Sequence, residues 1–320
     1  MATIQIKIKD GRSKTKKVKY HNPLSQAVIT TLSFFDILKQ PLKLKQIHQY
    51  LYRTTASTQD VAIMLKRLQG KGIVQEGRGY FYLNHKSLAL KNEKDEIKKN
   101  LLVLAKKAKN ILQHIPFVRS IMICNSLALG GVKKTSDIDF LIITKKNRIY
   151  FTRILAIIAL KIFNLYQNKI SEPKKISLGF FIDEEGLNIK KIKLKSDPYL
   201  FFWIASLKPI FGFKSYYKLC RENNWLKKEL PNFFPKKGIL GKRTFWQKIL
   251  EKFSSAIIMD RLENLIRKLQ QRRISSLPEN SWPSSTTIAK KHILKLHAED
   301  KRQYFRKKLE KKLKENLKII

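Results

Sequence analysis

The chain has 320 residues, of which 43% are hydrophobic and 10% aromatic, so it can bury a sizeable core and is not a disordered polyelectrolyte. Its formal net charge of +43 favours an anionic partner such as nucleic acid, a nucleotide or a membrane surface. A bias towards A/T-rich codons explains the charge equally well, because only 15 of the 67 basic residues are arginine.

Cysteine content and hydropathy indicate the cellular compartment in which the protein is expected. The two cysteines, Cys124 and Cys220, allow at most one disulfide and have no zinc-binding spacing. The first 19 residues are basic and contain no apolar signal core, and the longest apolar stretch, 151–165, is interrupted by charges and too short to span a bilayer. We therefore expect a cytoplasmic protein without a transmembrane segment.

The first quarter of the chain contains three helical patterns and a hairpin signal. A basic tail, with a strand-like alternation at residues 4–8, precedes them. Apolar residues spaced by three and four predict helices over 24–38, 44–52 and 57–69, the last with a capping box at its start. Two β-like runs then flank Gly77-Arg78-Gly79, which indicates a hairpin.

Three helices followed by a hairpin are typical of a winged helix-turn-helix. The third helix would be the recognition helix, and Arg78 would lie at the tip of the wing. That helix offers few side chains able to read bases: Gln59, Lys66, Arg67 and Gln69. Two interpretations stay open, a DNA-binding module and a module used for protein docking or structure alone.

The middle of the chain alternates helices and strands. A long charged helix is predicted over 87–114. Strands are predicted over 117–124, 137–144 and 176–182, with a Gly-containing loop between the first two and a helix over 147–167 before the third. This order indicates a mixed sheet covered by helices.

Beyond residue 197 the pattern is mainly helical, with predicted helices over 199–207, 214–223, 244–273 and 299–318 and a loop or hinge over 275–287. The predicted fold class is α+β and multidomain: a winged helix-turn-helix, a mixed-sheet domain and a mainly helical C-terminal region. The expected segments are a basic tail (1–23), the winged helix (24–86), a linker helix (87–116), the sheet domain (117–196) and the helical region (197–320).

Two aspartates carry the strongest chemical signal. Asp137 and Asp139 open a predicted strand, where residues i and i+2 point to the same face. Two neighbouring carboxylates repel each other unless a cation lies between them, and oxygen ligands suit Mg²⁺ or Mn²⁺. The apolar run 140–143 would fix both acids at the strand edge, an arrangement suited to metal-dependent phosphoryl transfer.

The run from Asn125-Ser126 through Gly130 to Asp137-Ile138-Asp139 resembles the signature of the polymerase-beta-like nucleotidyltransferase superfamily. That signature is a Gly-Ser turn followed by Asp-x-Asp on the next strand. The resemblance implies that Ser126 and nearby backbone amides hold the terminal phosphates of a nucleoside triphosphate. It also implies that Asp137 and Asp139 bind the metals that bridge to the triphosphate.

Two positions depart from that signature. Asn125 stands where the turn usually has its first glycine, and it brings a side chain towards the phosphates. The third acid of the family is not obvious, and Asp183 is the candidate, with a turn or capping role as its alternative. Lys133 and Lys134 in the loop are candidates for neutralising triphosphate charge. A third carboxylate close to both aspartates would favour an enzyme, and its absence a ligand sensor.

The chain from about 24 to 316 is also similar to a group of bacterial nucleotidyltransferase-like proteins that begin with a winged helix. That similarity includes Asp197-Pro198-Tyr199, Asn224-Trp225-Leu226 and the segment 296–302. The leading hypothesis is Mg²⁺-dependent transfer of a nucleoside monophosphate from an NTP to an unknown hydroxyl acceptor. The alternatives are a winged-helix regulator with a degenerate nucleotide-sensing domain, and an enzyme that modifies a partner toxin.

Overall fold

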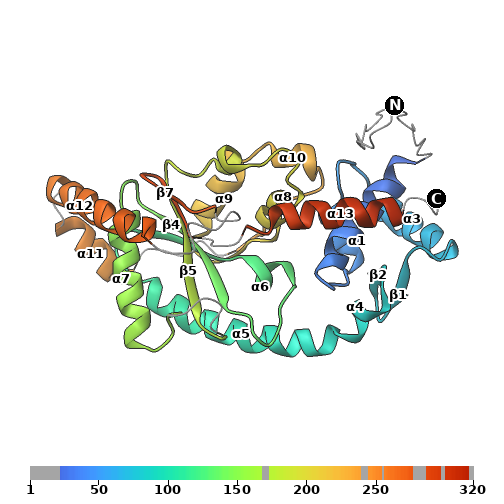
Figure 1. The fold of residues 1–320 in the computed structure, drawn as a ribbon, viewed down its shortest axis with the longest axis horizontal. Helices are drawn as coiled ribbons and strands as arrows, with labels where there is room; N and C mark the ends of the chain where they lie inside the picture. The colour runs from blue at the N-terminus through green and yellow to red at the C-terminus, as the bar shows by residue number, and fades with distance from the viewer. Residues whose placement is uncertain are drawn as a thin grey trace.

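The computed structural model of the chain describes residues 22–167, 173–238, 244–253, 256–276, 286–296 and 300–316. The fold is α+β, as predicted, with helices packed around a mixed six-stranded sheet in the order β6-β3-β4-β5-β8-β7 (Figure 1). The predicted basic tail up to residue 21, most of the predicted hinge and the predicted start of the last helix at 299 lie outside the described residues.

The first helices begin at capping residues that the sequence contains. Asn22 accepts hydrogen bonds from two backbone amides at the start of α1 (Pro23–Ile37), and Ser57 and Asp60 form the predicted capping box of α3 (Thr58–Gly70). The short helix α2 (Leu44–Gln49) lies between them. Each cap satisfies amides that have no partner within the helix, which fixes where the helix begins.

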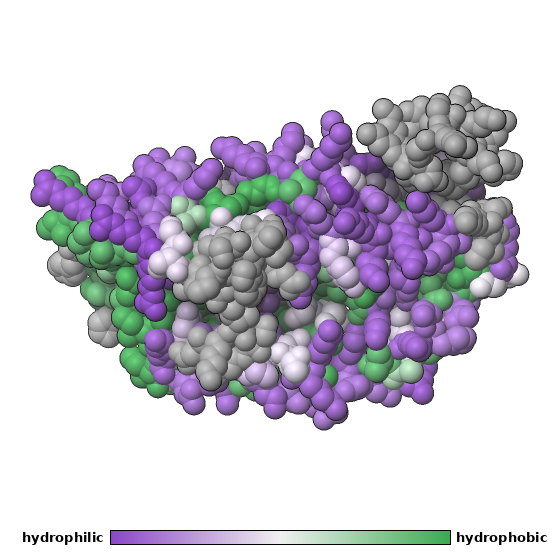
Figure 2. Space-filling view, viewed as in Figure 1, coloured by the Kyte–Doolittle hydropathy of each residue, from purple (hydrophilic) through white to green (hydrophobic). Residues whose placement is uncertain are grey.

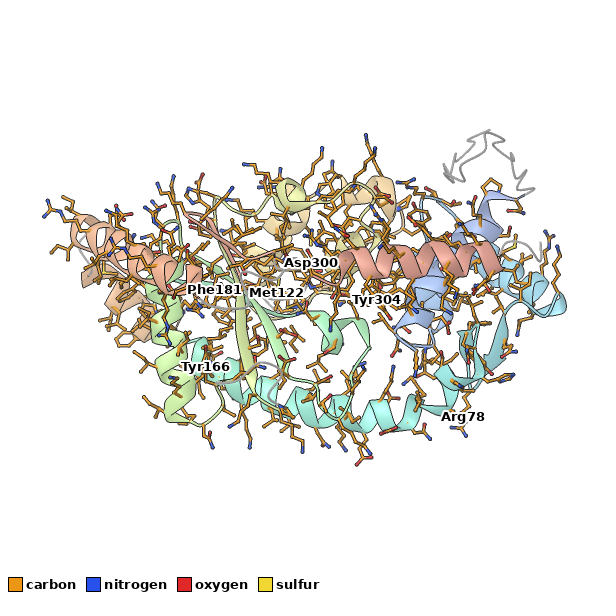
Figure 3. The ribbon with its side chains drawn as sticks, viewed as in Figure 1. Arg78, Met122, Tyr166, Phe181, Asp300 and Tyr304 are labelled. Atoms are coloured by element: carbon orange, nitrogen blue, oxygen red, sulfur yellow. The ribbon has the colours of Figure 1, made fainter. Side chains whose placement is uncertain are left out.

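A two-stranded hairpin follows these helices. β1 (Gln75–Gly77) pairs antiparallel with β2 (Tyr80–Tyr82). Arg78 and Gly79 both have positive φ, 54° and 73°, which is the backbone that a two-residue hairpin turn requires. Figure 3 shows Arg78 at the edge of the molecule, at the tip of this hairpin, where its side chain is exposed.

The predicted linker helix is present as two helices, α4 (His85–Ala89) and the longer α5 (Lys91–Leu112). α5 runs along one side of the molecule, from the hairpin to the sheet (Figure 1). Its buried stripe includes Leu101, Ala105, Ala108 and Leu112, at the spacing of a helix that packs by one face. The helix α5 therefore follows the N-terminal helices in the chain and packs its buried face against the sheet.

The centre of the sheet consists of three strands. β3 (Val118–Ile123) pairs antiparallel with β4 (Ile138–Thr144), and β4 pairs parallel with β5 (Ile176–Asp183). The helix α7 (Ile149–Ile162) lies between β4 and β5 in the chain, as the crossover that parallel strands need. These elements match the predicted ones within a few residues.

The region beyond residue 197 is not helical alone, and it completes the sheet. β6 (Lys208–Phe211) pairs with β3 at one edge, and β8 (Ile293–Lys295) pairs with β5 at the other, next to β7 (Ile288–Lys290). These strands have three or four residues, too few for a periodic sequence pattern. Pro209 also argues against a strand in the sequence, because proline cannot donate a hydrogen bond to a neighbouring strand. It is tolerated in β6 because β6 is an edge strand.

The helices of this region are separated by turns and by residues outside the described part. They are α8 (Pro198–Ser206), α9 (Phe213–Glu222), α10 (Leu226–Glu229), α11 (Phe245–Phe253), α12 (Ala256–Ser275) and α13 (Arg302–Asn316), preceded by a 3₁₀ turn, η1 (Ile189–Ile192). The single helix predicted over 244–273 is thus two helices in the described residues.

Two hydrophobic cores lie on the two faces of the sheet. One face packs on α5 and α7 through residues such as Ile138, Phe140 and Ile142. The other, which includes Leu141 and Ile143, shares its core with α8 and the N-terminal helices. Aromatic rings continue this second core from the sheet to α1, where Phe34 stacks on Phe202 of α8 at 4.2 Å. The predicted N-terminal and C-terminal segments therefore share one core.

Figure 2 shows that most of the surface in view is hydrophilic, with hydrophobic residues gathered at the end of the molecule that holds α7 and α12. Exposed large apolar side chains there include Ile162, Phe163, Phe245, Ile257 and Ile258. No helix of the described residues combines the length and apolar character needed to cross a membrane.

Candidate active site

Asp137 and Asp139 lie at the start of β4. Asp139 is the second residue of the strand and pairs with Ser177 of β5, and Asp137 directly precedes the strand. The alternation along β4 places Asp139 on the same face as Leu141 and Ile143, which pack towards α8. Both aspartates are half-buried, so the strand holds them at the edge of the core next to α8.

The electrostatics of the pair differ from those of ordinary surface acids. Burial and the neighbouring charge of Asp137 together raise the pKa of Asp139 to about 7, against the hydrogen bonds from Asn125 and Ser177, which lower it. Burial also raises the pKa of Asp137, which is opposed by a 3.0 Å hydrogen bond from Gln167 and by the charge of Lys301. Without a cation the pair therefore tends to retain a proton near neutral pH.

The residue before Ser126 is asparagine for a local geometric reason. Asn125 has a φ of 50°, in the left-handed region that glycine and asparagine tolerate best, and it begins the one-turn helix α6 (Asn125–Leu129). Its side-chain oxygen accepts a 2.7 Å hydrogen bond from Trp203 Nε1, and its amide hydrogen-bonds to Asp139. The side chain thus links the acid pair to α8 and lies beside it.

The structure does not bring Asp183 to the pair. Asp183 ends β5 and pairs with Thr144, whereas Ser177 pairs with Asp139, so six residues of parallel strand, about 20 Å, separate the two ends. Asp183 is fully buried and accepts hydrogen bonds from the backbone amides of Asn147, Glu185 and Gly186 and from His292 Nδ1. Its selection as the third ligand was wrong, because it closes turns at the far end of the sheet.

The remaining predicted residues lie around the turn. Ser126 is half-buried in the first turn of α6, directly after Asn125, whose side chain bonds to Asp139. Lys133 and Lys134 are exposed, and Lys134 forms an ion pair with Glu93 of α5 at 3.3 Å. In the described part of the chain, neither lysine forms an ion pair or a hydrogen bond with Asp137 or Asp139.

The acid pair fits a magnesium ion by its chemistry. Mg²⁺ is commonly bound through one or two carboxylates, and waters and substrate phosphates complete its shell. A cation between Asp137 and Asp139 would relieve the repulsion that raises their pKa values. Within the described ranges, however, no group of three Asp, Glu, His or Cys side chains is arranged to hold a metal ion. The site thus offers two carboxylates, with Ser177 and Asn125 as polar neighbours.

The sequence pattern did not predict four residues that lie near the pair: Gln167, Ser177, Trp203 and Lys301. Lys301 belongs to the segment 296–302, which the sequence similarity includes. Next to it, Arg302 binds Asp300 through two nitrogens and reaches Asp197 at 3.2 Å, so this segment is fastened to the start of α8. Asp300 lies between the sheet and α13 in Figure 3. This contact joins the segment 296–302 to Asp197, which precedes Pro198-Tyr199 at the start of α8.

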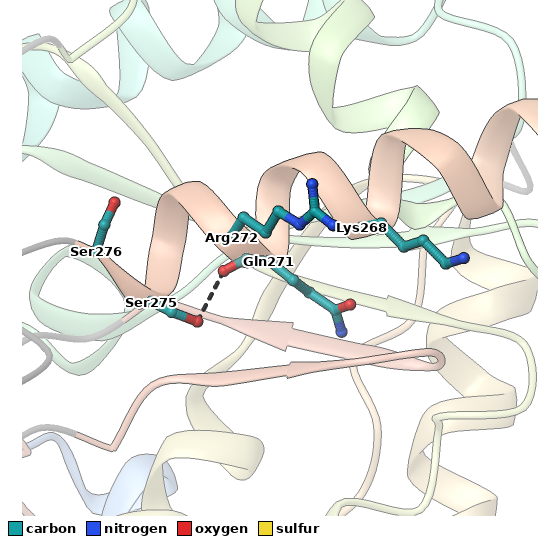
Figure 4. A pocket seen from close by; sticks show the side chains of 5 residues that line it. All are labelled: Lys268, Gln271, Arg272, Ser275 and Ser276. Carbon is teal, nitrogen blue, oxygen red and sulfur yellow. Dashed lines mark hydrogen bonds between the residues drawn. The ribbon is translucent and has the colours of Figure 1, made fainter.

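One surface hollow lies away from the acid pair. It has a volume of about 600 Å³ and is lined by α12 residues and the turn after it: Lys268, Gln271, Arg272, Ser275 and Ser276 (Figure 4). The hollow is open, and its two serine hydroxyls are used locally: Ser275 Oγ donates to the Gln271 carbonyl and Ser276 Oγ to the Arg273 carbonyl. It contains no acid or other arrangement for phosphoryl transfer, so we base the function on the aspartates.

Comparisons of the chain with protein-family models, with curated proteins and with solved structures find no match. The functional interpretation therefore depends on the acid pair and its surroundings.

Proposed function

We propose that the chain is a Mg²⁺-dependent nucleotidyltransferase that moves a nucleoside monophosphate from an NTP to a hydroxyl acceptor. The observation that carries the proposal is the pair Asp137 and Asp139 at the start of β4, two neighbouring carboxyl groups whose pKa values are both raised by burial. Two such acids stabilise a divalent cation, and phosphoryl transfer requires the placement of metal and phosphates more than covalent chemistry.

Each residue near the pair has an assignable role in this proposal. Asp137 and Asp139 would hold the ion, which would neutralise triphosphate charge when bound. Ser177 and Gln167 would orient the two carboxylates through the hydrogen bonds that they donate. Ser126 would hold a phosphate oxygen, and Lys301 would add positive charge beside the pair. Lys133 and Lys134 remain candidates for steering an NTP from the exposed loop.

A nucleotide assay separates binding from turnover. We expect the wild-type chain to bind each NTP more tightly with Mg²⁺ or Mn²⁺ than with EDTA, measured by calorimetry. Labelled nucleotide should then be incorporated into RNA, protein or small-molecule hydroxyls, with release of pyrophosphate. The double variant Asp137→Asn/Asp139→Asn should lose both, whereas the exposed control Glu185→Gln should retain both. Equal inertness of the wild type and the double variant would refute the catalytic proposal.

A second candidate is a nucleic-acid-binding regulator whose nucleotidyltransferase-type domain senses a nucleotide without turning it over. Two observations favour it: Asn125 occupies the turn with a side chain bonded to Asp139, and no third carboxylate joins the pair in the described residues. The three N-terminal helices and the hairpin would form the winged helix. Gln59, Lys66, Arg67 and Arg78 are exposed there, as DNA contact requires.

The regulator makes a different set of predictions. NTP binding without incorporation, together with DNA binding that depends on sequence, would support it. Binding to all DNA sequences alike, with a steep loss in salt, would instead reflect the +43 charge alone. The variant Arg67→Gln should reduce selective binding, with Arg261→Gln of α12 as a control for a lost surface charge.

A further inference from the structure

Three lysines from distant parts of the chain gather where α5 crosses the edge strand β6. They are Lys98 of α5, Lys208 at the start of β6 and Lys236 in the segment after α10. All three are half-buried. Burial and then the charge of Lys98 and of Lys236 lower the pKa of Lys208 to about 7, and burial and Lys98 lower that of Lys236 to about 8. Lys236 binds the carbonyls of the two residues directly before Lys208, and α5 contacts β6, so the segments that carry the three lysines meet at this edge of the sheet.

The cluster has no acidic counterpart in the described residues. None of the three lysines forms an ion pair there, whereas Lys91, Lys193 and Lys295 all do. Asp95, three residues before Lys98, lines a hollow of about 510 Å³ together with Lys98, but its carboxylate pairs with Lys91. Cys220 faces Lys236 as a neutral thiol, because burial raises its pKa to about 11.

Hydrogen bonding separates this cluster from lysines with a structural role. An ammonium group has three donors. Lys94 directs its donors to the carbonyls of Leu38, Lys39 and Gly130 and thereby caps the ends of two helices. Lys208 instead donates to one carbonyl, that of Leu127, and the ammonium group of Lys98 has no hydrogen bond to another described residue.

Lys236 lies between these extremes. Its ammonium group donates to the carbonyls of Ser206 and Leu207 at the end of α8, which leaves one of its three donors. The cluster thus combines positive charge that has no ion-pair partner in the described residues with ammonium donors that no described acceptor uses. Burying cations in this state is unfavourable, and an anion with several acceptor oxygens would relieve it.

We propose that Lys98, Lys208 and Lys236 form a binding site for a phosphate group, separate from the acid pair. Phosphate is favoured over a carboxylate because its doubly charged form presents three terminal oxygens to donors on three sides. The site lies close to the aspartates, since Lys208 binds the carbonyl of Leu127, two residues after Asn125 in α6. It uses no metal, so it goes beyond the proposed transferase and does not depend on it.

Two kinds of ligand could supply this phosphate group: a free nucleoside phosphate or the backbone of a nucleic acid strand. Titrations with tripolyphosphate, with ATP and with a single-stranded RNA oligonucleotide distinguish them. They are performed in EDTA with the Asp137→Asn/Asp139→Asn chain, so that failure of the metal site does not affect the result. Tighter binding of RNA than of the small anions, per phosphate, would identify the backbone as the source.

The decisive variant is Lys98→Gln, because Lys98 caps no helix. We expect it to weaken tripolyphosphate binding at least tenfold at pH 7 by calorimetry, and its matched control Lys237→Gln, an exposed neighbour of Lys236, to change binding less than twofold. In the chain that retains all three lysines, tripolyphosphate should also raise the pKa of Lys208, which is measured by NMR of the Lys208 side chain. Equal losses in the two variants, or an unmoved Lys208, would overturn the proposal and leave general attraction to a basic chain.

Discussion

The two ends of the β4–β5 pair each hold an aspartate beside a turn, and the two ends differ in what surrounds the carboxylate. At the far end, Asp183 accepts three backbone amides and His292 and has no acid among those partners. At the near end, Asp139 has a second carboxylate beside it and receives side-chain hydrogen bonds. Saturation by backbone amides indicates a structural acid, whereas two acids held together indicate a site for a cation.

The largest effect should come from the saturated end. Asp183→Ala leaves three backbone amides and a histidine without their acceptor, at about 1–3 kcal/mol for each buried unpaired group. We therefore expect a loss of roughly 3–5 kcal/mol in the free energy of unfolding, measured in urea, with Asp139→Asn close to the wild type at pH 6. A mild effect of Asp183→Ala would show that the two ends are alike.

The comparison also shows what the sequence already contained. The period of two in a strand places Asp137 and Asp139 on one face, and the structure has Asp139 on the face that packs towards α8. The helix between β4 and β5 indicates parallel strands, which begin at the same end of a sheet. An acid at the end of β5 must then lie far from acids at the start of β4. That reasoning points to Ser177 as the neighbour of Asp139 and excludes Asp183.

Other features could not be predicted from a sequence pattern. β6 joins β3 across the 84 residues of chain between Ile123 and Lys208, and the lysine cluster forms only because α5, β6 and the segment after α10 meet there. The 2.7 Å bond from Trp203 to Asn125 is of the same kind. Such contacts depend on long-range packing, whereas caps and hairpin turns depend on residues within four positions of one another.

The second effect is a pH dependence located at the near end. The folded chain holds a proton on Asp139 up to about pH 7, whereas the unfolded chain releases it near pH 4, so stability falls as pH rises between these values. We expect a loss of roughly 3 kcal/mol across this window in EDTA, partly restored by Mg²⁺ above pH 7. Asp139→Asn should flatten the profile and remove the Mg²⁺ effect, and Glu185→Gln should keep both. An unchanged profile in Asp139→Asn would place the titration elsewhere.

The third effect tests why asparagine stands in the turn. At a φ of 50°, Asn125→Ala adds a left-handed cost of about 1–2 kcal/mol and removes the bonds to Trp203 and Asp139. Asn125→Gly removes the same bonds without that cost, so unfolding in urea should rank wild type first, glycine second and alanine last. Both variants should shift the Trp203 emission by a similar amount. Equal stability of the two variants would show that the backbone angle is unimportant.

The smallest effect concerns the exposed loop. The side chain of Lys134 is 80% exposed, and its ion pair with Glu93 lies in water, where such pairs contribute little. Lys134→Gln should therefore leave unfolding unchanged within about 0.5 kcal/mol. If the loop steers an anionic nucleotide to the aspartates, the variant should slow NTP association about twofold at low salt and have no effect at 0.5 M salt, measured by stopped flow. The same variant in the Asp137→Asn/Asp139→Asn chain is the control, and a loss that persists at high salt would instead indicate a direct contact between Lys134 and the bound phosphates.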